Sequence, residues 1–391
     1  MSFAVLIEKL ISEKAQTFIA NHLKEDTNKL RLKYHQKDNF PHSECIDQIE
    51  AKQRLFKKNP SWANNSALIF PPKLNVEQSS SEATSNYKAG IVHGDRFIDL
   101  TGGMGVDSIA LSKRFKEGVY CELSNSLCKI SEHNFEVLNA NIKTVNKNSF
   151  NVLKEATQQF DLAYADPARR IEGKRVVSLK DCEPDITKAL DLIFEKANQL
   201  LIKTSPLLDI SKVLTEILFV KEVHVVSVNN ECKELLFLSE KGNQNKPQIV
   251  AVNIIAEKVD VLSSSSYTPE ISYGLPKNYL LEPNAIIMKS ALFSELADSF
   301  NLLKLQKNSH LFTTDILPSN FPGKVFEIEE ILQPFKKSLK GESFNIVTRN
   351  FGMKPEQIKK KLKTKDGGAR FLYATTLKDN KKAFIMCKKV D

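Results

Sequence analysis

The sequence is poor in the patterns that build metal and redox centres. Its 391 residues include six cysteines and seven histidines. No two cysteines form a Cys-x-x-Cys pair, and no two histidines have His-x-x-x-His spacing. These absences exclude the usual motifs of zinc ribbons, iron–sulfur proteins and redox dithiols. We therefore expect isolated, reduced thiols and no bound metal.

Long apolar runs are also missing. No stretch approaches the ~20 residues of a membrane-spanning helix. The N-terminus reaches Glu8 and Lys9 after a few apolar residues and has no basic leader, so neither a membrane span nor a signal peptide is expected. The sequence therefore predicts a cytoplasmic protein. The chain is long enough for two to four domains, and its 41% hydrophobic content suits globular folding.

Positive charge is present, but it lies at one end. The net charge is +9, and residues 334–391 alone hold 16 Lys or Arg and 5 Asp or Glu. The remainder of the chain is therefore slightly acidic. A charge confined to one end favours a docking surface for a polyanion. A solvated basic tail is the alternative.

The periodicity of apolar residues divides the chain. Residues 1–92 have the three- and four-residue spacing of helices, and 77–84 resemble a capped helix start. From Arg96, short apolar runs alternate with amphipathic segments, which predicts a parallel sheet with helices on both faces. The runs 235–238 and 249–255 follow each other and suggest an antiparallel closing hairpin. A serine-rich linker at 263–276 then leads to two small α+β segments.

The first chemical signal is a glycine turn between a strand and a helix, at residues 99–105. Glycines there let a ligand approach the backbone closely. A dinucleotide fold prefers Gly-x-Gly-x-x-Gly, but Ser108 stands three residues after Gly105. A carboxylate in the turn suits a cationic ligand, such as the ammonium and sulfonium of S-adenosylmethionine (SAM). The cofactor site is expected to contain Asp99, Thr101, Gly102, Gly103, Gly105 and Asp107.

Two further polar residues follow the next predicted strands. Glu122 lies 23 residues after Asp99, directly behind the run 119–121. A carboxylate there can accept hydrogen bonds from both ribose hydroxyls. Asn148 follows the third strand, where methyltransferases commonly bind the adenine amine. An ordinary turn residue is the alternative for Asn148.

The fourth predicted strand ends in Asp166-Pro167-Ala168-Arg169-Arg170. Methyltransferases that act on amines carry Asp-Pro-Pro-Tyr or Asn-Pro-Pro-Tyr there. Asp166 and Pro167 are expected to orient an acceptor, with Arg169 or Arg170 holding a phosphate or stacking on a base. The missing aromatic residue leaves the acceptor atom open. Residues 203–206 and 229–234 follow the next two strands and are expected to line the cleft or to form turns and caps.

Taken in order, these motifs resemble the bacterial class I SAM-dependent methyltransferases with ferredoxin-like and THUMP-like C-terminal domains. Further segments share the resemblance, namely 77–88, 203–210, 227–236, 279–284, 349–351 and 365–368. The resemblance implies a Rossmann-like, seven-stranded class I methyltransferase sheet at 93–262. It also implies an N-terminal helical region (1–92), a ferredoxin-like domain (279–321) and a basic THUMP-like domain (322–391). SAM is the implied cofactor and RNA the implied partner, because THUMP domains bind RNA.

The sequence therefore predicts methyl transfer from SAM to a nucleotide of a structured RNA. An RNA-binding module with an inactive methyltransferase domain is one alternative, and a DNA or small-molecule acceptor is another. An NAD-linked oxidoreductase is disfavoured by Asp99 in the glycine turn and by Asp166-Pro167 after the fourth strand.

Overall fold

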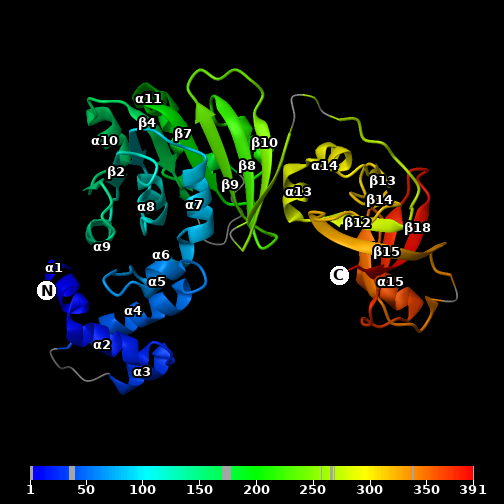
Figure 1. The fold of residues 1–391 in the computed structure, drawn as a ribbon, viewed down its shortest axis with the longest axis horizontal. Helices are drawn as coiled ribbons and strands as arrows, with labels where there is room; N and C mark the ends of the chain where they lie inside the picture. The colour runs from blue at the N-terminus through cyan, green and yellow to red at the C-terminus, as the bar shows by residue number, and fades with distance from the viewer. Residues whose placement is uncertain are drawn as a thin grey trace. The chain divides into compact units, whose positions relative to one another are not determined.

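The fold comes from a computed structural model that describes residues 3–34, 40–169, 178–256, 258–264, 267, 269–336 and 339–390. The chain divides into two compact units. The first comprises Met1–Val223 and Glu234–Pro247, and the second comprises His224–Lys233 and Gln248–Asp391. Figure 1 shows the elements of both units.

The first unit begins with helices, as the periodicity predicts. They are α1 (Phe3–Ile11), α2 (Glu13–His22), α3 (Thr27–Lys33), α4 (His42–Leu55), α5 (Pro60–Asn64), α6 (Lys73–Gln78) and α7 (Glu82–Gly90). The predicted cap is confirmed, because the Ser81 side chain accepts a hydrogen bond from the Thr84 amide. Trp62 and Phe70 share a core with Met104 and Val106 of the glycine-turn region. The N-terminal helices therefore buttress that turn.

A nine-stranded sheet follows. Its strands are β1 (Arg96–Asp99), β2 (Glu117–Cys121), β3 (Ile142–Val145), β4 (Phe160–Ala165), β7 (Ala197–Thr204), β8 (Val220–Val228), β9 (Glu231–Glu240), β10 (Gln248–Ile255) and β11 (Lys258–Ser263). The spatial order is β11-β10-β8-β9-β7-β4-β1-β2-β3. Strands β3, β2, β1, β4 and β7 pair in parallel, and β9 is antiparallel to β7. This is the expected class I methyltransferase arrangement with two further strands, β10 and β11, at one edge.

The predicted hairpin between 235–238 and 249–255 is wrong. Strands β9 and β10 are not neighbours, because β8 lies between them. The cause is the two-residue turn at Asn229 and Asn230, whose φ angles are 52° and 64°. Two consecutive left-handed residues are typical of the tight turn that joins adjacent antiparallel strands. Strand β10 pairs instead with β11.

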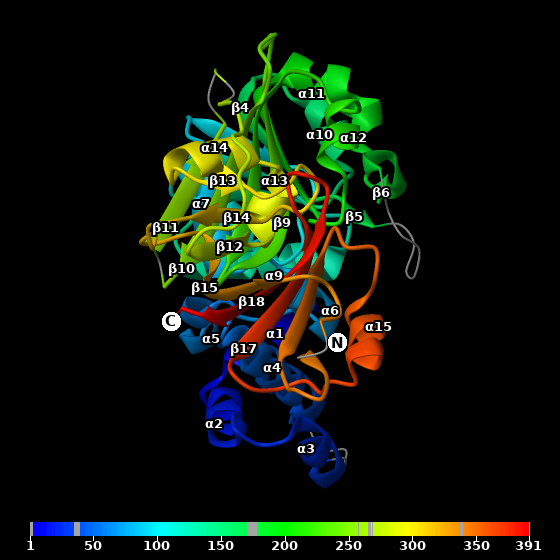
Figure 2. The ribbon, with the colours of Figure 1, turned by 90° about the vertical axis from the view of Figure 1, so that its right-hand side faces the viewer.

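Helices cover the strands of this sheet that belong to the first unit. Helix α8 (Val106–Ser112) packs on α7 and β2, and α9 (Asn125–Val137) packs on β3. Helices α10 (Ser149–Glu155) and α11 (Leu190–Lys196) contact each other and lie with α12 (Ile210–Leu214) on one side of the sheet (Figure 2). Short elements complete the unit: β5 (Ala168–Arg169), β6 (Cys182–Glu183), η1 (Leu179–Asp181) and η2 (Ile186–Ala189).

The second unit contains a seven-stranded sheet in the order β13-β14-β12-β15-β18-β17-β16. Its elements are β12 (Tyr279–Pro283), α13 (Ala285–Ser290), α14 (Phe293–Ser299), β13 (Leu303–Lys304), β14 (Phe312–Thr314), β15 (Gly323–Leu332), β16 (Asn345–Arg349), α15 (Pro355–Leu362), β17 (Arg370–Thr376) and β18 (Lys382–Lys389). Because β12 pairs with β15, the two small α+β segments expected from the sequence share one continuous sheet.

None of the six cysteines forms a disulfide, and five of them are buried. Burial raises the pKa of Cys45 and of Cys387 to about 12, so these two remain protonated and unreactive. Within the described ranges no helix is long and apolar enough to cross a membrane.

Candidate active site

The carboxyl ends of the parallel strands bring the predicted site residues to one edge of the sheet. Asp99 pairs in register with Tyr120 of β2 and Tyr164 of β4. Ala165 of β4 pairs with Ile202 of β7. The residues that follow these strands are therefore neighbours, which is where ligands bind in open α/β sheets.

The carboxylate of Asp99 organises the glycine turn. Its Oδ1 accepts hydrogen bonds from the amides of Thr101 (3.0 Å) and Gly102 (3.2 Å), and its Oδ2 accepts one from Ser108 Oγ (2.5 Å). Asp99 is only 1% exposed. Burial raises its pKa to about 7, although these hydrogen bonds oppose the shift. A cation bound at the turn would favour the ionised form.

The glycines of the turn have two different tasks. Gly102 has a φ of +54°, and a Cβ there would lie 2.6 Å from Glu122 Oε2. Gly105 has a φ of +80°, and its Cβ would lie 2.8 Å from the Phe135 ring. Gly103, at φ +83°, would meet no heavy atom within 4 Å. Gly102 and Gly105 allow tight packing, whereas Gly103 faces open space where a Cβ would stand.

Glu122 stands directly after β2 and contacts the glycine turn. Its Oε2 accepts a hydrogen bond from the Gly103 amide (2.9 Å), and its Oε1 accepts one from the Ser124 amide (2.7 Å). Each oxygen keeps acceptor capacity for a further donor. Asn148, by contrast, caps α10, because its Oδ1 accepts hydrogen bonds from the Phe150 and Asn151 amides. The turn-and-cap alternative for Asn148 is thus the role the structure displays.

The Asp166 segment is tied to the glycine turn and to β7. The Asp166 amide donates to Thr101 Oγ1 (2.8 Å). Lys203 Nζ donates to Asp166 Oδ2 (2.5 Å). The lysine pKa is raised, because attraction to nearby carboxylates outweighs the cost of burial. Pro167 is buried, and the backbone of Arg169 lies in β5. The Arg169 side chain and all of Arg170 lie outside the described residues.

A buried charge cluster behind the edge was not predicted. Lys88 of α7 is 1% exposed. Its Nζ lies 2.7 Å from Glu234 Oε1 and 3.2 Å from Asp107 Oδ1. Asp107 Oδ2 also accepts hydrogen bonds from Ser80 Oγ and Tyr164 Oη, each 2.7 Å. Asp107, expected to bind the cofactor, therefore faces inward.

The sequence carried one signal for this cluster. Ser81, Ser85 and Lys88 follow one another at helical spacing on α7, a polar stripe on a helix that also contacts α8. Such a stripe facing another helix indicates buried polar partners.

Burial disfavours the charged form of Asp107, but the positive charges of Lys88 and Lys203 outweigh this effect and lower the Asp107 pKa.

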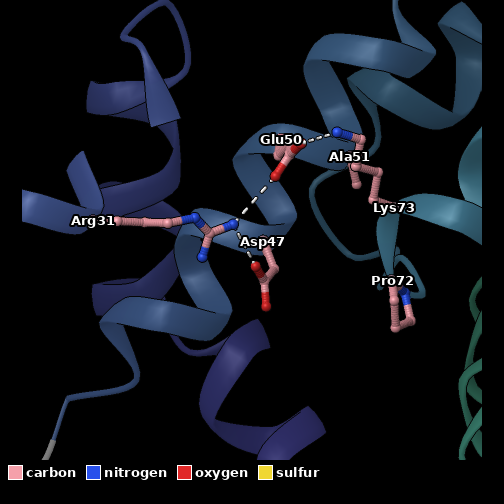
Figure 3. A pocket seen from close by; sticks show the side chains of 6 residues that line it. All are labelled: Arg31, Asp47, Glu50, Ala51, Pro72 and Lys73. Carbon is pink, nitrogen blue, oxygen red and sulfur yellow. Dashed lines mark hydrogen bonds and ion pairs between the residues drawn. The ribbon is translucent and has the colours of Figure 1, made fainter. Parts of the chain in front are cut away.

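A pocket of about 230 Å³ lies among the N-terminal helices, lined by Arg31, Asp47, Glu50, Ala51, Pro72 and Lys73 (Figure 3). Arg31 pairs with Asp47 (2.7 Å) and Glu50 (3.2 Å). Lys73 also pairs with Glu50 (3.6 Å). The two basic and the two acidic side chains of this pocket therefore form ion pairs with each other. In the part of the chain that the structure describes, no group of three or more His, Cys, Asp or Glu could hold a metal ion.

Comparison with known proteins gives the family. A profile described as a ferredoxin-like domain matches residues 279–322, and one described as THUMP domain-like matches 323–389. A solved structure described as a "putative methyltransferase" from Porphyromonas gingivalis W83 is 31% identical. The similarity covers 97% of this chain and 98% of that chain, with a TM-score of 0.81. The chain belongs to the class I SAM-dependent methyltransferases with ferredoxin-like and THUMP-like C-terminal domains.

Other solved methyltransferases resemble this family member over less than half of its length. One is the 16S rRNA N2 G1207 methyltransferase of T. thermophilus in complex with AdoMet and guanosine, with 14% identity, coverage of 42% and 44% of the two chains, and a TM-score of 0.34. Another, from Streptococcus mutans in complex with SAH, has 16% identity, coverage of 41% and 96%, and a TM-score of 0.30. No curated protein matches the sequence.

The cofactor of this methyltransferase is SAM, as its family implies. The residues present fit such a molecule. A Cβ at Gly103 would meet no heavy atom within 4 Å, so the backbone there is open to close approach by a ligand, and the Gly103 amide is hydrogen-bonded to the Glu122 carboxylate. Behind the turn, the carboxylate of Asp99 is buried, and in its ionised form it would complement a cationic ligand.

Proposed function

We propose that this methyltransferase transfers the methyl group of SAM to a nucleotide of a structured RNA. One observation carries the assignment of the acceptor side. The Asp166 backbone amide donates a hydrogen bond to Thr101 in the glycine turn. The Asp166 carboxylate accepts one from Lys203 of β7. These contacts support a carboxylate held in a fixed position relative to the methyl donor, and alignment of that kind accelerates methyl transfer.

The cofactor roles in this proposal follow the contacts. Glu122 accepts hydrogen bonds from the ribose hydroxyls, and the backbone of Gly103 lies against the cofactor. Thr101, Gly102 and Gly105 shape the turn, with Asp99 holding it closed from behind. Asp107 and Asn148 support the site through Lys88 and through the cap of α10, respectively.

The acceptor chemistry is derived from Asp166. Bound SAM supplies a methyl group activated by its sulfonium. Asp166, hydrogen-bonded to Lys203, would accept a hydrogen bond from an exocyclic amine and turn the nitrogen lone pair toward the methyl carbon. As the new N–C bond forms, the bond between the methyl carbon and the sulfonium sulfur would break with its electron pair left on sulfur, and the amine proton would be released to this carboxylate or to solvent. Pro167 stiffens the segment, and Arg169 is assigned to a phosphate or base of the acceptor.

The basic C-terminal segment supports RNA as the acceptor. In α15, Ile358 and Leu362 are buried, while Lys360, Lys361 and the C-cap residue Lys363 are exposed. The apolar side of α15 is therefore buried, and these lysines are exposed to solvent. Within this proposal, 1–92 support the SAM domain at 93–262, and 279–321 with 322–391 deliver the RNA. Action on RNA in the cytoplasm accords with the reduced thiols.

Comparison of RNA from a deletion strain with that of its parent tests this function. Mass spectrometry of total nucleosides should reveal one methylated nucleoside missing from the deletion strain and restored by the wild-type gene. An unchanged RNA nucleoside profile would reject RNA methylation. The remaining functions would then be an inactive RNA-binding module, or methylation of DNA or a small molecule.

Replacing Glu122 with alanine should weaken SAM binding by ~1–3 kcal/mol, because charge-assisted hydrogen bonds to the ribose are lost. Calorimetry with SAM and with S-adenosylhomocysteine measures the change. Glu117→Ala provides the control, since Glu117 lies on β2 but is exposed. Equal affinities of the Glu122 and Glu117 variants would remove Glu122 from the cofactor site.

Replacing Lys360, Lys361 and Lys363 together with glutamine should weaken RNA binding, because fewer phosphate counterions are released. The log–log salt slope should become shallower by roughly 2. Binding is measured by fluorescence anisotropy over a salt series. The control replaces Lys24, Lys29 and Lys57, which are exposed in the N-terminal region and carry the same total charge. Identical slopes for both triple variants would refute RNA docking at α15.

A further inference from the structure

A second basic cluster lies in the second unit, away from α15 in the sequence. It surrounds the loop between β13 and β14 and the N-terminal end of α14, elements that lie together in Figures 1 and 2. Its members are Lys304, Lys307, His310 and Arg349. Two motifs that the cofactor site does not use, 279–284 and 349–351, meet beside it.

Lys304 is the unusual member, because it is buried without a carboxylate. The residue is only 3% exposed. Among the described residues, no acidic group forms an ion pair with its ammonium, and no hydrogen-bond acceptor contacts it. Its Nζ lies 4.5 Å from the centre of the Phe293 ring and 5.9 Å from that of Phe312. Burial, and then the charge of Lys307, lowers the Lys304 pKa. A buried cation next to a second cation is costly unless an anion binds it.

His310 leaves a second polar group without a partner at the same place. Its ring stacks on Phe293 with centres 4.5 Å apart. Its Nδ1 is buried and makes no hydrogen bond in the described part of the chain. Burial lowers the His310 pKa, and the charges of Lys304 and Arg349 lower it further. Lys304 and His310 therefore both pack against the Phe293 ring, and Lys307 lies between them in the β13–β14 loop.

The surrounding contacts hold this cluster in place. Arg349 pairs with Glu282, whose Oε2 also accepts a hydrogen bond from Tyr373 Oη (2.8 Å). The side-chain amide Nδ2 of Asn350 donates to Gln306 Oε1 (2.9 Å) and ties the two loops together. Glu282 neutralises one of three permanent cations. The cluster therefore keeps an excess of positive charge on a braced scaffold.

We propose that Lys304, Lys307, His310 and Arg349 form a phosphate-binding site for the RNA substrate. A phosphate group would supply the anion that Lys304 lacks and acceptors for the neighbouring N–H groups. The aromatic contacts of Lys304 explain how its stem packs. They do not explain why a lysine, rather than methionine, occupies the position. The site deepens the proposed function and rests on it, because it places an RNA contact in the ferredoxin-like segment.

The test uses the full chain and a fluorescein-labelled ribooligonucleotide of ten uridines, which offers phosphates without a specific sequence. Binding is followed by anisotropy over a potassium chloride series. Lys304→Gln should lower the affinity about 3- to 10-fold at low salt and make the slope shallower by about 0.7. Lys381→Gln is the control, since Lys381 is exposed in the same unit and paired with Asp379.

Because Lys304 is buried, Lys304→Gln could weaken binding by disturbing the fold, so a second variant changes an exposed residue of the cluster. Lys307 is exposed, so Lys307→Gln removes a charge from the cluster without disturbing the core. It should weaken binding by about 2- to 5-fold, in the same direction as Lys304→Gln. A folded Lys307 variant that binds like the wild type, with an unaltered slope, would overturn the site. The proposed function would survive that result, whereas an unchanged RNA nucleoside profile in the deletion strain would end it independently.

Discussion

Replacement of Asp166 by alanine is expected to lower turnover by about two orders of magnitude, while the Kd for SAM stays within about threefold. The asymmetry follows from position. Asp166 is one-third exposed, beyond the glycine turn, and its only described side-chain partner is Lys203. Loss of acceptor alignment of this kind costs about 10²-fold, whereas the turn retains Asp99 and Glu122 for SAM. Transfer of labelled methyl groups to RNA from the deletion strain measures turnover.

Two further variants make the Asp166 result specific. Asp166→Asn keeps the shape and tests whether negative charge is needed. Asp191→Ala removes an exposed aspartate of α11 in the same unit and should leave turnover unchanged. An Asp166→Ala protein that retains turnover within threefold of the wild type would show that another group orients the acceptor.

Replacement of Lys88 by methionine is expected to destabilise the first unit by about 3–5 kcal/mol. The change leaves Glu234, which is 2% exposed, without its cation and removes the ion pair to Asp107. Stranded buried carboxylates cost more than a surface ion pair contributes. Urea unfolding followed by Trp62 fluorescence measures the loss, because the single tryptophan is buried in the core of the same unit.

Lys221→Met is the matched control for the Lys88 experiment. Lys221 pairs with Glu240 in the first unit, and both side chains are nearly half exposed. Its replacement should cost about 0–1 kcal/mol. The double variant Lys88→Met with Glu234→Leu should recover part of the lost stability, since one stranded carboxylate is removed. Equal costs for the Lys88 and Lys221 variants would contradict the role assigned to the buried cluster.

The sequence predicted the elements whose cause is local. Apolar runs such as 160–165 are buried on both faces of the sheet, and a short continuous apolar run of this kind predicts a strand. Ser81 caps α7 through a hydrogen bond to Thr84, which is only three residues away in the sequence. The glycine turn was visible because its three glycines have positive φ angles that other residues rarely adopt. The N-terminal helices and the parallel sheet follow from such patterns, whereas the class I arrangement of the strands was implied by the family resemblance.

Only the tertiary structure decided which charges meet. Lys88 and Glu234 are 146 residues apart, and no local pattern pairs them. The same holds for Asp166 with Lys203, and for Arg349 with Glu282. The partner of a strand is also non-local, which is why β9 was predicted beside β10 but lies beside β7 and β8. Local propensity sets the elements, while burial of charge and strand pairing depend on residues that approach only when the chain has folded.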